Sequence, residues 1–117
     1  MDITAAEQAL TRFAAERLGL TVDESIFRGS VPEGLTGVAV RFESGIPGTD
    51  RPAEFTARIF GIFDEPDEAR EFAERLWGGL PKYGVGGFIE IAPNGRISFE
   101  EADGRFTATG FLRAVFA

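Results

Sequence analysis

One stretch, residues 53–78, constrains the fold more than any other part of the chain, because its hydrophobic period changes within it. Residues 53–63 alternate between two faces, with Phe55, Ala57 and Ile59 on one of them, which is the pattern of a β-strand. Further on, apolar residues recur at the spacing of one helical face, at Ala69, Phe72, Ala73, Leu76 and Trp77. The stretch therefore predicts a long strand that leads through a short acidic turn into an amphipathic helix.

Local signals predict where this helix and an earlier one begin and end. Asp64 or Glu65 can cap the helix in the stretch 53–78, Pro66 suits its first turn, and Gly78 can end it. Residues 4–18 predict the earlier helix, with an apolar stripe at Ala6, Leu10, Phe13, Ala14 and Leu18. Thr4 and Glu7 have the spacing of a capping box, and Gly19 is placed to end that helix.

The remaining strands are predicted from alternation and from turn residues. They cover residues 36–43, 88–92 and 105–116. Residues 97–100 are predicted to be a short extended piece, and residues 26–28 are a candidate for a short strand. Residues 44–52 are rich in Gly and Pro and are expected to join two strands as a long hairpin loop. The length of that loop either reflects ordinary variation among loops or makes it an arm that contacts a neighbouring molecule. Residues 78–87 are expected to be a Gly-rich connection, without the pattern of a phosphate-binding loop.

The predicted order is α-β-β-α-β-β, within a single domain that spans residues 1–117. We expect an α+β fold in which two helices pack on one face of a mostly antiparallel four-stranded sheet. The second face then carries Phe60, Ile62, Phe111 and Val115, or the residues that alternate with them if the strand register differs. An uncovered face of this kind favours association with other chains. The twelve Phe residues either all belong to one core or in part face a partner subunit.

Charge and composition exclude several classes of function. The net charge of −7 is the wrong sign for wrapping nucleic acid or for docking on anionic lipid. No N-terminal targeting pattern and no apolar run long enough for a bilayer is present, so we expect a soluble, cytoplasmic protein. Without Cys, neither disulfides nor thiolate metal sites are available, and the redox compartment stays open.

Few side chains are suited to catalysis. With no His and no Cys, the commonest general base and the thiol nucleophile are missing, and Lys82 is the only lysine. Two carboxylate clusters remain, at residues 64–68 and 100–103. One interpretation is functional: such carboxylates bind a hard cation or serve glycoside hydrolysis. The second interpretation is structural: the first cluster complements a helix dipole, and the other is a solvated turn. We expect the second, and therefore a protein that is not an enzyme and holds no metal or cofactor.

Several segments together resemble the tail-terminator and minor capsid proteins of tailed bacteriophages. These segments are Leu18–Leu20, Thr36–Arg41, Phe55–Gly61 with the acidic turn and helix that follow it up to Leu80, and Gly110–Arg113. The resemblance covers most of residues 3–116 and is one of pattern, without an invariant motif.

This resemblance implies a structural role in the virion, with assembly in the host cytoplasm. Members of that group form a homo-oligomeric ring, typically a hexamer, which ends the tail tube and joins it to the head connector. DNA passes through the channel of the ring without specific binding, and no membrane is involved. The residues expected to contact other subunits or tail proteins lie in the hairpin loop and on one sheet face; they are Ile46, Asp50, Arg51, Arg58, Phe60, Ile62, Phe111 and Arg113.

Other classes of function remain open from the residues alone. A small acidic α+β domain can also be a monomeric or dimeric binding module, for example an immunity-type protein. Such a module would have a concave pocket bounded by the Phe-bearing face and would form no ring. Arg58 and Arg113 either form ion pairs at a surface or interface, or bind a phosphate or carboxylate.

Overall fold

The chain folds into two helices and seven strands. A computed structural model describes all residues, Met1–Ala117. The elements in chain order are α1 (Ile3–Leu18), β1 (Ile26–Arg28), β2 (Gly37–Ile46), β3 (Ala53–Phe63), α2 (Pro66–Trp77), β4 (Lys82–Val85), β5 (Phe88–Pro93), β6 (Ser98–Ala102) and β7 (Arg105–Phe116).

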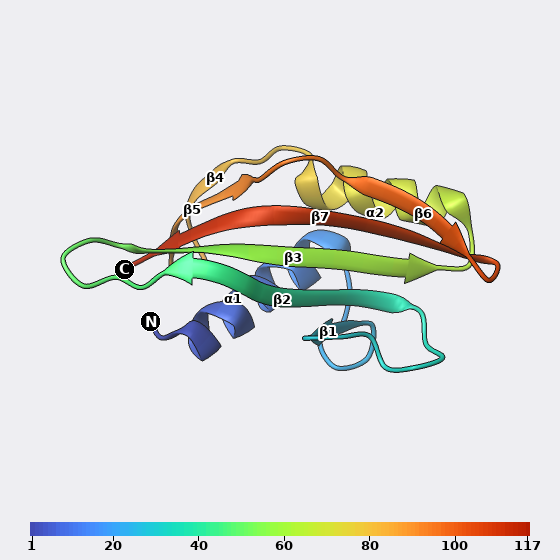
Figure 1. The fold of residues 1–117 in the computed structure, drawn as a ribbon, viewed down its shortest axis with the longest axis horizontal. Helices are drawn as coiled ribbons and strands as arrows, with labels where there is room; N and C mark the ends of the chain where they lie inside the picture. Colours follow the sequence, from blue (N-terminus) through green and yellow to red (C-terminus); the bar gives the residue numbers. More distant parts are fainter.

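All seven strands belong to one mixed sheet in the order β1-β2-β3-β7-β5-β4, with β6 paired to β7 as well. β1 runs parallel to β2, and every other pair is antiparallel. β7 is long enough to pair with two strands along the same edge. β5 pairs with its residues 112–116, and β6 pairs with its residues 105–109. The three longest strands, β2, β3 and β7, run along the molecule, whose longest extent is 48 Å (Figure 1).

The predicted four-stranded, mostly antiparallel sheet with the order α-β-β-α-β-β is wrong. The sheet has seven strands and is mixed, because β1 adds a parallel strand at its edge. β4 lies inside the Gly-rich connection predicted for residues 78–87, and its residues are mostly exposed, so no apolar alternation marks it. β6 is exposed along its whole length and is held only by its pairing with β7. Both strands are defined by hairpin pairing with the strand that follows them and not by an apolar alternation of their own.

Both helices cover the same face of the sheet and lie behind it in the view of Figure 1. Val40 of β2, Ile59 of β3 and Gly110 of β7 are aligned by the strand register, and all three are buried. α1 contacts β1 and β2, whereas α2 contacts β3 and β7. This side of the sheet, the helix side, holds the hydrophobic core. Neither helix is both long and apolar enough to span a membrane.

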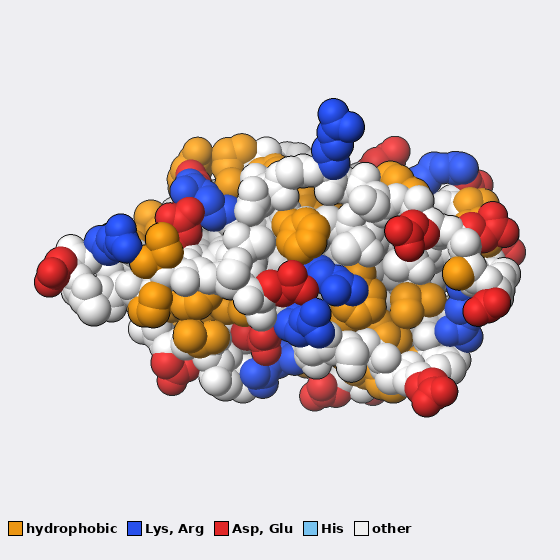
Figure 2. All heavy atoms as spheres, in the orientation of Figure 1, with side chains coloured by type: hydrophobic (Ala, Val, Ile, Leu, Met, Phe, Trp, Pro, Cys, Tyr) orange, Lys and Arg blue, Asp and Glu red, His pale blue; other side chains and the backbone are white.

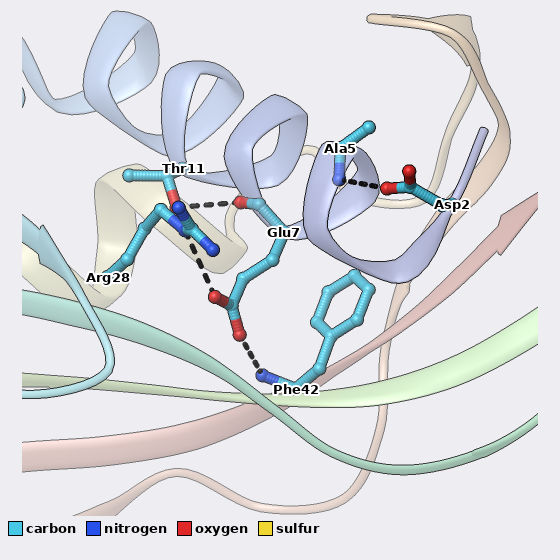
Figure 3. A network of polar contacts seen from close by, with 6 residues as sticks. All are labelled: Asp2, Ala5, Glu7, Thr11, Arg28 and Phe42. Atoms are coloured by element: carbon cyan, nitrogen blue, oxygen red, sulfur yellow. Dashed lines mark hydrogen bonds and ion pairs between the residues drawn. The ribbon is translucent and has the colours of Figure 1, made fainter.

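The start of α1 differs from the predicted capping box. Asp2 is the N-cap, and its carboxylate accepts a hydrogen bond from the Ala5 amide at 2.7 Å (Figure 3). Because Asp2 is a strong cap and precedes Thr4, the helix begins earlier than the box would place it. The side chain of Glu7 is thereby free to reach the sheet. It accepts hydrogen bonds from the backbone amide of Phe42 and from the Arg28 guanidinium, both at 3.0 Å.

α2 is fixed to the sheet through its last residue. The indole of Trp77 lies against Gly110, where an added Cβ would come within 2.5 Å of the ring. Its Nε1 donates a hydrogen bond to the Phe111 carbonyl oxygen at 3.2 Å. That carbonyl lies between the part of β7 paired with β5 and the part paired with β6. The same carbonyl also accepts a hydrogen bond from the Asn94 backbone amide at 3.0 Å, so Trp77 adds a second donor at the point where the neighbouring strand is interrupted.

Candidate interaction surface

The side of the sheet away from the helices is covered by no other element. We call this surface the open sheet face. Its side chains come from the positions of β2, β3, β5 and β7 that alternate with the buried ones. They include Ala39, Arg41, Glu43, Glu54, Thr56, Arg58, Phe60, Ile62, Glu90, Thr109, Phe111, Arg113 and Val115. Hydrophobic, basic and acidic side chains are interspersed along this face in Figure 2.

The centre of the open sheet face combines aromatic rings with arginine. Arg58 and Phe111 are direct neighbours across β3 and β7, and Phe60 follows two residues further along β3. The Arg58 guanidinium carbon lies 4.9 Å from the centroid of the Phe60 ring, within the range of a cation–π contact. All three side chains are partly exposed. Aromatic residues and Arg are the types enriched in protein interfaces, where Lys is depleted.

Arg113 links three strands on this face. Its guanidinium donates to the Glu54 carboxylate on β3 at 3.1 Å and to the Glu90 carboxylate on β5. The hydrogen bond to Glu90, followed by that to Glu54, raises the pKa of Arg113 above its ordinary value, so this side chain stays charged. The Arg113 guanidinium thus lies between two carboxylates, and the three charges form a fixed pattern across the sheet.

A second charged group on the same face is incompletely satisfied. Glu43 pairs with Arg41 at 3.0 Å and with Arg58 at 3.6 Å. The Nε atom of Arg58 is buried and has no hydrogen-bond acceptor. A buried donor without an acceptor costs free energy, unlike one that is exposed to water. Because the Nε atom is already covered by this chain, its missing hydrogen bond is a cost within the fold, and another molecule could reach only the exposed part of the Arg58 side chain.

Six of the eight predicted contact residues lie on the open sheet face. Five of them are Arg58, Phe60, Ile62, Phe111 and Arg113, and the sixth, Ile46, is on this side because it pairs with Glu54. Ile46 is the last residue of β2, and Asp50 and Arg51 lie in the loop 47–52, which extends from one end of the molecule (Figure 1). This loop is shorter than the predicted 44–52, because β2 continues past a bulge at Phe42–Ser44 and pairs with β3 up to Ile46.

Sequence reasoning did not identify a groove on the helix side, between α2 and β6. The groove has a volume of about 870 Å³, and its apolar lining includes Trp77, Ile97, Phe99 and Phe106. The alternation of Ile97, Ser98 and Phe99 was a signal for a strand, but only the pairing of Phe99 with buried Ala108 directs Phe99 to the helix side. That pairing is a property of the folded sheet, and the alternation alone does not reveal it.

The two carboxylate clusters do not come together as a metal centre. No group of three or more His, Cys, Asp or Glu side chains is arranged to hold a metal ion. In the first cluster Asp67 pairs with Arg70 at 2.6 Å, one turn further along α2. No known family model matches the chain, and no curated protein matches it significantly. The function is therefore inferred from the surfaces themselves.

Proposed function

We propose that this protein is a structural subunit that assembles with copies of itself, in the manner of a bacteriophage tail terminator. The observation that carries the proposal is the open sheet face, which follows the long strands β2, β3 and β7 and has no helix over it. Its partly exposed Phe60 and Phe111 are features that a neighbouring subunit would cover.

The electrostatics of the open sheet face support a specific contact. Arg113 and Arg58 are already held by carboxylates from neighbouring strands, so docking orders few further side chains. Alternating charges select one docking register, because a shift would bring like charges together. The face has arginines and no lysine, and the planar guanidinium of Arg loses less freedom per hydrogen bond that it forms. These properties favour a protein partner with a fixed geometry.

The tail-terminator assignment within this proposal is supported by the resemblance in sequence pattern. It specifies a ring, typically a hexamer, with the tail-tube and head-connector proteins as further partners. In such a ring the net charge of −7 would let DNA pass through the channel without being retained. The place of action would be the virion, and assembly would take place in the host cytoplasm. This role requires no catalytic group.

A second candidate function, a binding module that acts as a monomer or dimer, is favoured by the groove between α2 and β6. A groove of about 870 Å³ with an aromatic lining has the size and character of many ligand sites. It lies on the helix side and not beside the Phe-bearing open face. The two candidates therefore assign function to opposite sides of the sheet and differ in the expected oligomeric state.

The test is native mass spectrometry combined with light scattering over a range of protein and salt concentrations. A ring-sized species is expected for the unmodified protein, and Phe60→Glu is expected to yield a folded monomer, since a charge would be buried in the contact. Leu35→Glu is the matched control, because Leu35 is exposed in a loop outside this face. A strict monomer under all conditions would refute self-assembly and favour the binding module.

A further inference from the structure

The groove between α2 and β6 exists because the strand beside β7 is interrupted. β5 ends at Pro93 opposite Leu112, and β6 begins at Ser98 opposite Thr109. Trp77 lies in line with this gap, donating its hydrogen bond to the Phe111 carbonyl oxygen. Beyond the gap, β6 has no other strand on its outer side and no helix packs onto it. The space between β6 and α2 therefore stays open.

The lining of the groove is aromatic and acidic. Phe99 is 54% exposed, which is unusual for a Phe side chain, and it stands on the helix side of β6. Glutamates 74, 100 and 101 are among the lining residues, against one arginine, Arg70. An aromatic, acidic groove matches segments that combine Pro with Arg, since Pro packs on aromatic rings and guanidinium groups pair with carboxylates.

A segment of this composition lies at the other end of the same molecule. The loop 47–52 between β2 and β3 reads Pro-Gly-Thr-Asp-Arg-Pro and follows Ile46, whose side chain is exposed. All six loop residues are exposed, and none of the backbone hydrogen bonds formed outside the helices and strands involves them. Figure 1 shows this loop extending from one end of the sheet, while α2 and β6 occupy the opposite half.

We propose that the groove between α2 and β6 binds the loop 47–52 of a second copy of this chain. Arg51 of the loop then pairs with the glutamates of the groove, and the prolines pack on Phe99. A contact between opposite ends of identical subunits is heterologous, so it closes into a ring or continues as a filament. The inference rests on the proposed self-assembly, and it names the two surfaces that would make one contact between neighbours.

Because the chain has no Cys, engineered disulfides test this contact directly. The variants are Thr49→Cys in the loop and Glu101→Cys in the groove, and a disulfide requires Cα atoms within about 7 Å of each other. Oxidation of a mixture of the two single variants is expected to give a covalent dimer, and the double variant is expected to give a ladder of multimers. The control mixture replaces Glu101→Cys by Glu33→Cys, an exposed position outside the groove, and is expected to give no product.

The outcomes separate this inference from the proposed function. If light scattering shows an oligomer but Thr49→Cys and Glu101→Cys form no disulfide, the loop does not occupy the groove and self-assembly stands. If the protein is monomeric throughout, both fail.

A charge exchange gives an independent measurement of the same contact. Arg51→Glu is expected to weaken association about tenfold, which is about 1.4 kcal/mol, and adding Glu101→Arg is expected to restore it. Failure of the second change to restore association would contradict the pairing of Arg51 with the acidic groove. Circular dichroism confirms that each variant is folded.

Discussion

The two sides of the sheet use the same strands for different purposes. On the helix side Ile59 and Ala57 are fully buried, and Phe55 is nearly so. On the open sheet face Arg58 and Phe60, adjacent to them in sequence, stay partly exposed. The difference shows that alternation along one strand can specify the folded core with one set of residues and a partly exposed surface with the other.

The chemistry of the two sides differs as sharply as their burial. Thr11 is the one polar residue among the buried ones, and its hydroxyl donates to the Glu7 carbonyl oxygen at 2.7 Å. The open sheet face instead carries arginines 41, 58 and 113, each paired with a glutamate. The buried polar group of the core is therefore hydrogen-bonded within this chain, whereas the open sheet face leaves one arginine donor without an acceptor.

The largest expected effect is a contrast between neighbouring residues of β3. Ile59→Ala removes fully buried side-chain atoms beneath the helices and is expected to lower the free energy of unfolding by about 3 kcal/mol. Phe60→Ala on the open sheet face is expected to cost about 1 kcal/mol or less in the isolated subunit, but to weaken association. Urea unfolding followed by the fluorescence of Trp77, the single tryptophan, measures both at matched protein concentration.

A comparable loss of stability for the two alanine variants would contradict the comparison. It would mean that the open sheet face contributes to the fold as much as the helix side does.

A smaller effect is expected at Gly110, where the helix side approaches β7 most closely. Gly110→Ala places a methyl group against the Trp77 ring, which is held by its own hydrogen bond, so the ring has to shift. We expect a loss of about 1–3 kcal/mol and an altered Trp77 emission spectrum. Thr109→Ala, next to it on the open sheet face, is the control and should leave the spectrum unchanged.

The smallest effect is expected for an ion pair on the open sheet face. Glu54→Gln leaves Arg113 paired with Glu90, so the midpoint of thermal unfolding should stay within about 2 °C of the unmodified value. Association should weaken and become less sensitive to salt, because one charge of the contact pattern is lost. A large drop in thermal stability would show instead that this charge group holds the sheet together.

Sequence reasoning predicted the parts of the fold that are specified locally. The long strands β3 and β7 and both helices have enough residues for a clear period, and β3 begins and ends where the alternation does. β1 and β4 are short. β4 contains Gly84, and its first three residues are exposed. Only their pairing with β2 and β5 makes them strands, so the number of strands was underestimated.

The candidate surfaces follow the same division. Arg58, Phe60 and Ile62 were grouped correctly because the period of a strand places them on one side. Phe111 and Arg113 joined them through the register of β3 with β7. The groove between α2 and β6 was missed because it depends on a break between β5 and β6 and on the position of Trp77. No local pattern encodes such a break.

The carboxylate of Glu7 also protects a strand edge. β1 ends at Arg28 opposite Val40, and the next outward-facing amide of β2, that of Phe42, donates to Glu7 in place of a strand carbonyl. Exposed edge amides are where sheets from different molecules join without control. A side chain from α1 thus blocks part of that edge without lengthening the sheet. A subunit that has to assemble in one geometry benefits from closing such competing routes to aggregation.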